Sequence, residues 1–279
     1  MIKAFKLASA LNVILLLGAA HGSASAENLK VVASFSIISD FARNVGGDRI
    51  DLTTLVGPDG DAHVYEPKPS DAAAAAGADV VLVDGWKFEG FLPRLVEASA
   101  TKAPIVELTK GVEPLKSSEE EHDHADGEEH KHEGHGHGEA GHNHGAYDPH
   151  AFQSVGNAKI YVKNIADAFC TADAANCETY KTNAADYTKK LDATEADVKA
   201  AIAAIPENKR LVITSHDAFG YFEQAYGLKF LAPEGISTDS EASAADIVAL
   251  IKQIKEDKAS AIFVENITNP RLIEQIATE

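Results

Sequence analysis

The sequence predicts an α/β protein of two lobes, each with a mostly parallel sheet flanked by helices, joined by one long linking helix. Apolar runs of strand length alternate with helix-period segments over residues 29–109, and the alternation restarts near residue 209. A long uninterrupted helix-period segment lies between these two regions. Because consecutive parallel strands need helical crossovers, this alternation favours parallel sheets covered on both faces.

The first 26 residues predict a secretory signal peptide. Lys3 and Lys6 precede an apolar run of about 14 residues, and residues 24–26 (ASA) are small enough for cleavage. The run is shorter than the roughly 20 residues that span a bilayer. No cysteine follows it to carry a lipid. We therefore expect a periplasmic protein whose mature chain begins near Glu27.

The first lobe is predicted to comprise residues 27–116 and 147–177. Its expected elements are strand 29–36, helix 36–47, strand 51–58, helix 71–78, strand 78–85, helix 88–98, strand 103–109 and helix 154–169.

The linking helix is predicted over residues 178–205, where a helix would be about 37 Å long and could cross a whole domain. The second lobe, residues 206–279, has expected strands at 209–215, 228–233 and 259–266 and a helix at 243–258. The sequence stops inside a further helix-like segment without a terminal cap. We therefore expect the second lobe to be truncated.

Residues 117–146 form an insertion of different composition, with eight His, nine Asp or Glu and no large aliphatic residue. Such a segment cannot build a core and predicts a flexible insertion. Its closely spaced imidazoles suit weak, auxiliary binding of Zn, Ni or Cu, although an acidic solvated linker is the alternative. The histidines are His122, His124, His130, His132, His135, His137, His142 and His144.

The net charge of −18 becomes −20 when Lys3 and Lys6 leave with the signal peptide. This balance argues against nucleic acid and anionic lipid as partners. The cysteines, Cys170 and Cys177, lie seven positions apart, and the oxidising periplasm favours a local disulfide over two free thiols. A zinc site built on this pair is disfavoured because the spacing is not CxxC.

Three histidines outside the signal and the insertion lie where strand-like segments end or a helix starts. His63 follows the strand at 51–58, His150 begins a helix in DPHAF, and His216 follows RLVITS. Ligands of parallel sheets gather outside the carboxyl ends of the strands, so these imidazoles are expected to meet at a cleft. Any one of them alone is more often a surface or capping residue; their shared placement favours a metal site.

Carboxylates accompany each of these histidines. An imidazole that binds a metal needs an acceptor for its second ring nitrogen, and Asp61, Glu66, Asp148 and Asp217 lie within three positions of a candidate ligand. Helix capping and loop solvation explain the same carboxylates equally well.

Five segments in order resemble the signatures of the zinc and manganese solute-binding proteins of bacterial ABC transporters: GDAHVYEPKPSD, DPHAF, TSHDAFGYF, ISTDSEASAADI and VENITNPRLIEQIA. The resemblance covers residues 29–279, with Phe152 where family members often have Trp. It implies a receptor, not an enzyme, that binds metal between its lobes through His63, His150 and His216. It also implies delivery to a membrane permease, with a periplasmic zinc chaperone as a further candidate partner and a monomeric state.

The family's usual fourth ligand is an Asp in a late loop, which the resemblance places beyond Glu279. Glu265 is the nearest carboxylate to test as a substitute, although an accessory or capping role suits it better. Three imidazoles suit tetrahedral Zn²⁺, whereas Mn²⁺ favours oxygen donors, so Zn²⁺ is the expected cargo and Mn²⁺ the alternative. A zinc hydrolase is disfavoured because no HExxH occurs, and a periplasmic zinc buffer is the remaining alternative.

Overall fold

The computed structural model describes residues 27–117, 145–239 and 242–278. The predicted signal peptide and the eight histidines of the insertion lie outside these ranges. Within them, every helix is too short or too polar to cross a lipid bilayer.

The first lobe is built on a parallel four-stranded sheet with the strand order β2-β1-β3-β4. Its strands are β1 (Leu29–Phe35), β2 (Ile50–Val56), β3 (Val80–Val83) and β4 (Ile105–Glu107). The central strands β1 and β3 are buried over nearly their whole length, because helices cover both faces of the sheet. Their mostly apolar sequences suit this double coverage.

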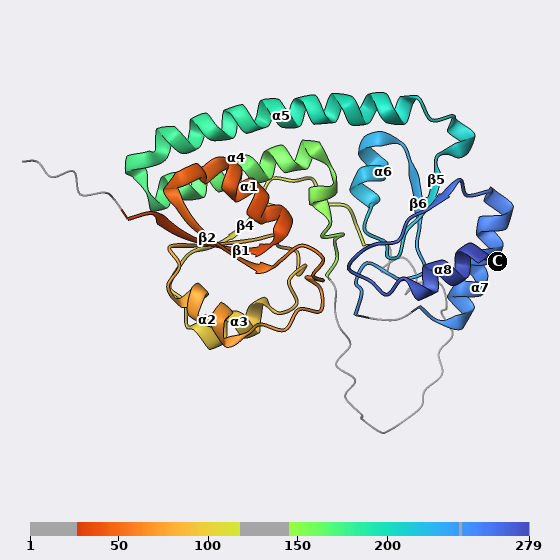
Figure 1. Ribbon diagram of the computed structural model, residues 1–279, viewed down its shortest axis with the longest axis horizontal. Helices are drawn as coiled ribbons and strands as arrows, with labels where there is room; N and C mark the ends of the chain where they lie inside the picture. Colours follow the sequence, from red (N-terminus) through yellow and green to blue (C-terminus); the bar gives the residue numbers. More distant parts are fainter. Residues whose placement is uncertain (1–26, 118–144, 240–241, 279) are drawn as a thin grey trace, which may run out of the picture.

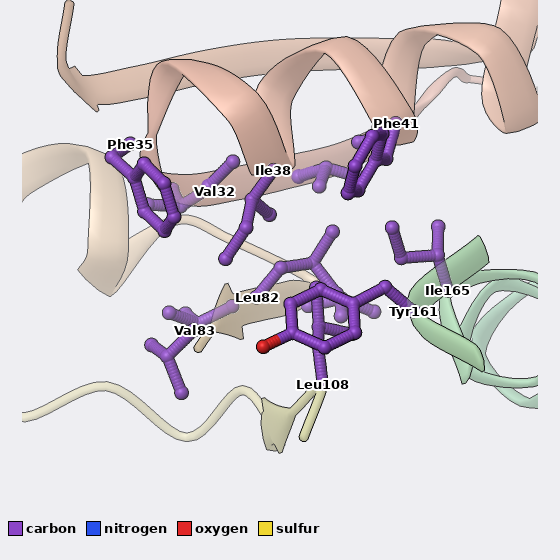
Figure 2. Packing of buried hydrophobic residues seen from close by; sticks show 14 of the residues in the cluster. Val32, Phe35, Ile38, Phe41, Leu82, Val83, Leu108, Tyr161 and Ile165 are labelled. Atoms are coloured by element: carbon purple, nitrogen blue, oxygen red, sulfur yellow. The ribbon is translucent and has the colours of Figure 1, made fainter. Parts of the chain in front are cut away.

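Helices α1 (Ser36–Gly46) and α4 (Val155–Ala172) cover one face of this sheet, and α2 (Pro69–Ala76) and α3 (Leu92–Ser99) cover the other (Figure 1). Val32, Ile38, Leu82 and Ile165 come from four different elements and meet in the core (Figure 2). The core therefore fixes the directions in which the strand ends point.

The long helix α5 (Cys177–Ala203) packs on α1 and α4 and then runs on to the second lobe (Figure 1). A disulfide joins Cys170, in the last turns of α4, to Cys177 at the start of α5, which confirms the predicted pair. Short 3₁₀ turns occupy Gly47–Arg49, Ala151–Gln153, Ala174–Asn176 and Glu207–Lys209.

The second lobe contains a parallel sheet with the strand order β6-β5-β7. Its elements are β5 (Leu211–Ile213), α6 (Gly220–Tyr226), β6 (Lys229–Leu231), α7 (Ala244–Asp257), β7 (Ala261–Ile262) and α8 (Arg271–Thr278). Its core is smaller and centres on Ile213, Leu250, Ile273 and Ile276.

Helix α6 connects the lobes, because Tyr221 is buried in the core of the first lobe and stacks on Trp86 at 6.4 Å between ring centroids. The Tyr221 hydroxyl also accepts the backbone N–H of Leu115 at 2.9 Å.

The predicted fold class is confirmed: two helix-flanked parallel sheets are joined by one long helix. Most boundaries shift by one to three residues, and two differ more from expectation. The helix expected from residue 88 begins at Leu92, because Trp86 and Lys87 adopt positive φ angles (49° and 66°) and form a turn first. The strand expected over 259–266 is reduced to β7, beyond which the Glu265 carboxylate bonds the segment after β5.

Candidate metal centre

The imidazoles of His63, His150 and His216 converge at one point between the lobes. One ring nitrogen from each lies within 4.8 Å of those of the other two. The Nε2 atoms of His63 and His150 are 3.1 Å apart, and the three ring centroids are separated by 5.2 to 5.7 Å. These distances leave the three nitrogens facing a common centre.

Each imidazole reaches this centre from a different segment. His63 lies in the loop between β2 and α2, His150 directly precedes the 3₁₀ turn before α4, and His216 follows β5 within three residues. The strands β2 and β5 belong to different sheets, and the loops after their carboxyl ends meet at the contact between the lobes. Two of these histidines were placed after strands and one at a helix start in the sequence, and the structure brings their imidazoles together as expected.

Burial shapes the chemistry of two of the rings. His150 is 2% exposed and His216 is 3% exposed. Burial lowers the pKa of His150, and the Asp148 carboxylate opposes this shift. The ring is therefore neutral near pH 7, which leaves a lone pair available to a metal.

The Nε2 atom of His216 is buried and has no hydrogen-bond partner among the described residues. A buried polar atom without a partner loses the hydration it has in water, which costs about 1–3 kcal/mol. Because this nitrogen is one of the convergent donors, a cation at their centre would satisfy it.

Two carboxylates hold the outer nitrogens of the buried rings. Asp148 Oδ1 lies 2.8 Å from His150 Nδ1 and also accepts the backbone N–H of His150 at 2.9 Å. Glu265 Oε2 bonds His216 Nδ1, while its other oxygen accepts the Ser215 N–H at 3.1 Å. With Nδ1 donating to a carboxylate, the Nε2 lone pair of each ring points inward.

The other candidate carboxylates behave differently. Asp61 accepts the backbone N–H of His63 at 2.9 Å, so it supports the loop of that residue. Glu66 is exposed and pairs with Arg94 at 3.1 Å. Asp217 contributes negative charge near His150, and its backbone N–H bonds Gly235.

A cavity of about 360 Å³ opens beside the three imidazoles, with aromatic walls. Phe88 packs against His63 and His150, with ring centroids 4.7 and 5.6 Å apart, and Phe152 packs on Phe88 at 5.5 Å. These rings restrict the imidazoles without offering competing polar atoms.

Sequence reasoning missed three residues that shape this site. Phe88 was assigned only to a helix, Thr238 bonds Asp61 from the opposite lobe, and Gly220 packs against Asp148. A Cβ at Gly220 would lie 2.8 Å from Asp148 Oδ2, so a larger residue there would push against the carboxylate that holds His150. Thr238 and Gly220 lie inside two of the motif segments, which was the available signal for them.

Comparison with known proteins gives consistent findings. The sequence profile of the family described as ZnuA, zinc-uptake complex component A, periplasmic, matches residues 31–279. The manganese ABC transporter substrate-binding lipoprotein PsaA of Streptococcus anginosus is 32% identical over 272 residues, which cover 96% of this chain and 83% of that protein. The iron ABC transporter substrate-binding lipoprotein MtsA of Streptococcus pyogenes serotype M1 is 34% identical over 257 residues, with coverages of 92% and 78%.

Among solved structures, the periplasmic zinc binding protein TroA of Treponema pallidum is similar to this chain with a TM-score of 0.76 and 25% identity. The match covers 89% of this chain and 82% of that one. The similar proteins thus share one fold, while their names refer to three different metals.

Proposed function

Because this chain belongs to the ZnuA family of periplasmic metal-binding proteins of ABC transporters, we propose that it is a Zn²⁺ receptor with His63, His150 and His216 as ligands. The family consists of substrate-binding proteins, so the function is capture of a metal ion and not catalysis. The bound ion is the cargo.

The observation that carries this proposal is the convergence of three imidazole nitrogens, two of them on rings whose Nδ1 atoms bond a carboxylate. Neutral imidazoles are good ligands for Zn²⁺, which accepts four ligands in a tetrahedron, whereas Mn²⁺ prefers more oxygen donors. The relatives are named for manganese, iron and zinc, so their names do not decide which metal this chain binds. The argument for the metal therefore rests on the ligand atoms. A nitrogen-rich set favours zinc.

Glu265 is better interpreted as the residue that holds His216 than as a fourth ligand. Both of its oxygens already accept hydrogen bonds, one from Ser215 N–H and one at His216 Nδ1. The fourth position of the tetrahedron then takes water or another oxygen donor.

Delivery completes the proposed role. We expect the loaded receptor to dock on the membrane permease of an ABC transporter, whose ATPase drives import, and to do so in the periplasm. A zinc chaperone as donor and a monomeric state remain predictions, because no contact among the described residues bears on either.

A competition titration tests the metal and the ligands together. The mature protein without residues 118–144 is titrated with Zn²⁺ and Mn²⁺ against a chelator, alongside a His216→Ala variant. We expect one tight Zn²⁺ per chain, much weaker Mn²⁺, and loss of tight Zn²⁺ binding in the variant. Tight Mn²⁺ binding that survives His216→Ala would reject the proposal.

A further inference from the structure

We propose that Asp61 positions His63 and, through its bond to Thr238 of the opposite lobe, slows the release of the bound metal. The inference rests on the proposed function, because it takes His63 and His216 as ligands from different lobes. It assigns a coupling role to two residues outside the ligand set.

The first step concerns the loop of His63. Asp61 Oδ1 accepts the backbone N–H of His63 at 2.9 Å, which closes a turn over residues 61–63. This bond fixes the backbone that carries the imidazole. The carboxylate keeps a second oxygen for another partner.

The second step crosses the cleft. Asp61 Oδ2 accepts a hydrogen bond from the Thr238 hydroxyl, and both side chains are half-buried. A hydrogen bond to a charged acceptor is stronger than one between neutral groups, and partial burial limits competition from water. The two lobes are therefore joined by a charge-assisted bond two residues from His63.

The third step connects Thr238 to the ligand of its own lobe. The loop that carries Thr238 follows β6 and runs beside the segment of His216. The backbone N–H of Asp217 donates to the carbonyl of Gly235 at 3.0 Å, and the backbone N–H of Glu234 donates to the carbonyl of Ser215 at 3.3 Å. Through these bonds Glu234 and His216 form an isolated parallel β-bridge. A continuous chain of bonds thus joins the backbone of His63 to that of His216.

A nearby exposed contact provides a comparison. The Asn266 amide donates to the Asp59 carboxylate, which also links the loop after β2 to the second lobe. Both of these side chains are exposed, so water competes for the bond and its contribution is expected to be small.

Because His63 and His216 come from different lobes, a separation of the lobes would part these two imidazoles and would break the Asp61–Thr238 bond. The bond is present in the arrangement of the lobes that the structure shows, so it favours this arrangement over a separated one by its own free energy. Its loss should raise the rate of metal release on the order of tenfold, with little effect on the fold of either lobe.

Release of Zn²⁺ from the full mature chain into excess chelator tests the inference. Thr238→Val removes the hydroxyl and keeps the branched shape, whereas Thr238→Ser retains a donor. We expect release about ten times faster for Thr238→Val, and a rate within about twofold of native for Thr238→Ser and for the exposed control Asn266→Ala. The melting temperature of the metal-free protein should not change.

A double-mutant cycle separates this role from a merely structural one. In an Asp61→Ala background, Thr238→Val should cause no further acceleration, because the hydroxyl has lost its partner. Native release rates in Thr238→Val, or an equal tenfold effect in the Asp61→Ala background, would overturn the inference. If the native protein proves to hold Mn²⁺ instead of Zn²⁺, the proposed metal fails, and the same comparison with Mn²⁺ release tests this bond separately.

Discussion

Two segments of the molecule, residues 61–63 and 148–150, share the pattern Asp-X-His and use the carboxylate in different ways. In both, one aspartate oxygen accepts the backbone N–H of the histidine two residues later at 2.9 Å. In the second segment the same oxygen also bonds the ring of His150, whereas in the first the other oxygen reaches Thr238 across the cleft. One local pattern therefore supports the imidazole ring in the second segment and links the two lobes in the first.

The surroundings explain the difference. Asp148 is 3% exposed, and its second oxygen is closely covered by Gly220 of α6. Asp61 lies half-buried at the edge of the cleft, where a hydroxyl from the second lobe is within reach. The turn that joins each aspartate to its histidine is local and follows from the sequence. The other hydrogen bonds of each carboxylate depend on which residues the tertiary structure brings near it.

Removal of an imidazole should have the largest effect on zinc affinity. The loss should be similar for the two segments, because each supplies one ligand. His63→Ala and His150→Ala should each weaken zinc binding by more than the 10–100-fold typical for loss of a group that only holds a ligand. Deletion of 118–146 should have a far smaller effect, because the three convergent imidazoles are already held in place, which avoids the cost of ordering the ligands on binding. Competition titrations measure both, and tight binding that required the insertion but not His63 would refute the site.

Substitution of the two aspartates should affect zinc affinity to different extents. Asp148→Asn removes the charge that supports a buried ring, and zinc affinity should fall about 10–100-fold. Asp61→Asn should cost less than about tenfold, because an amide can still accept the His63 N–H and donate to Thr238. Isothermal or chelator titrations of the two variants give the comparison directly. Equal losses would show that the distinction between the segments is wrong.

The pH dependence sharpens the same contrast. Zinc affinity should fall steeply as the pH drops below about 6.5, because imidazoles must lose their protons to bind metal. Burial lowers the pKa of His150 and Asp148 raises it, so Asp148→Asn lowers that pKa further and weakens proton competition.

The affinity deficit of Asp148→Asn should therefore narrow as the pH falls from about 7.5 to about 5.5, while that of Asp61→Asn stays constant. Titrations at a series of pH values test both trends. A flat profile for the native protein would exclude a three-imidazole site.

The disulfide serves as a control remote from both segments, and its effect on zinc binding should be the smallest. The bridge between Cys170 and Cys177 spans a sequence separation of 7, so its loss should lower the free energy of unfolding by about 2 kcal/mol. Zinc stoichiometry in the protein without the insertion should stay at one. Denaturant unfolding and metal analysis of the double Cys→Ser variant provide the test, and loss of zinc there would mean that the site depends on the α4–α5 corner.

The parts of this structure that depend on short-range pattern could be predicted from the sequence. Apolar strands, helix periods and the positions of His63, His150 and His216 at strand ends or a helix start were sufficient for the fold class and for the cluster of imidazoles. The disulfide followed from the spacing of two cysteines in an oxidising compartment.

The roles of the carboxylates could not be predicted, because they depend on contacts between distant residues. Asp61 and Asp148 look alike in the sequence, and only the residues from the second lobe, Thr238 and Gly220, distinguish them. Glu66 is close to His63 in sequence, yet it lies in solvent and pairs with Arg94, whereas Glu265, 49 positions from His216, bonds its ring. Sequence distance is therefore a poor guide to the support of an imidazole.

X-ray absorption spectroscopy of the mature protein without residues 118–144, isolated without added metal, tests the central claim most directly. The proposed site predicts one zinc per chain, with three imidazole nitrogens at about 2.0–2.1 Å and one oxygen donor. A shell of six oxygens, manganese in place of zinc, or a spectrum unchanged in a His150→Ala variant would contradict the account.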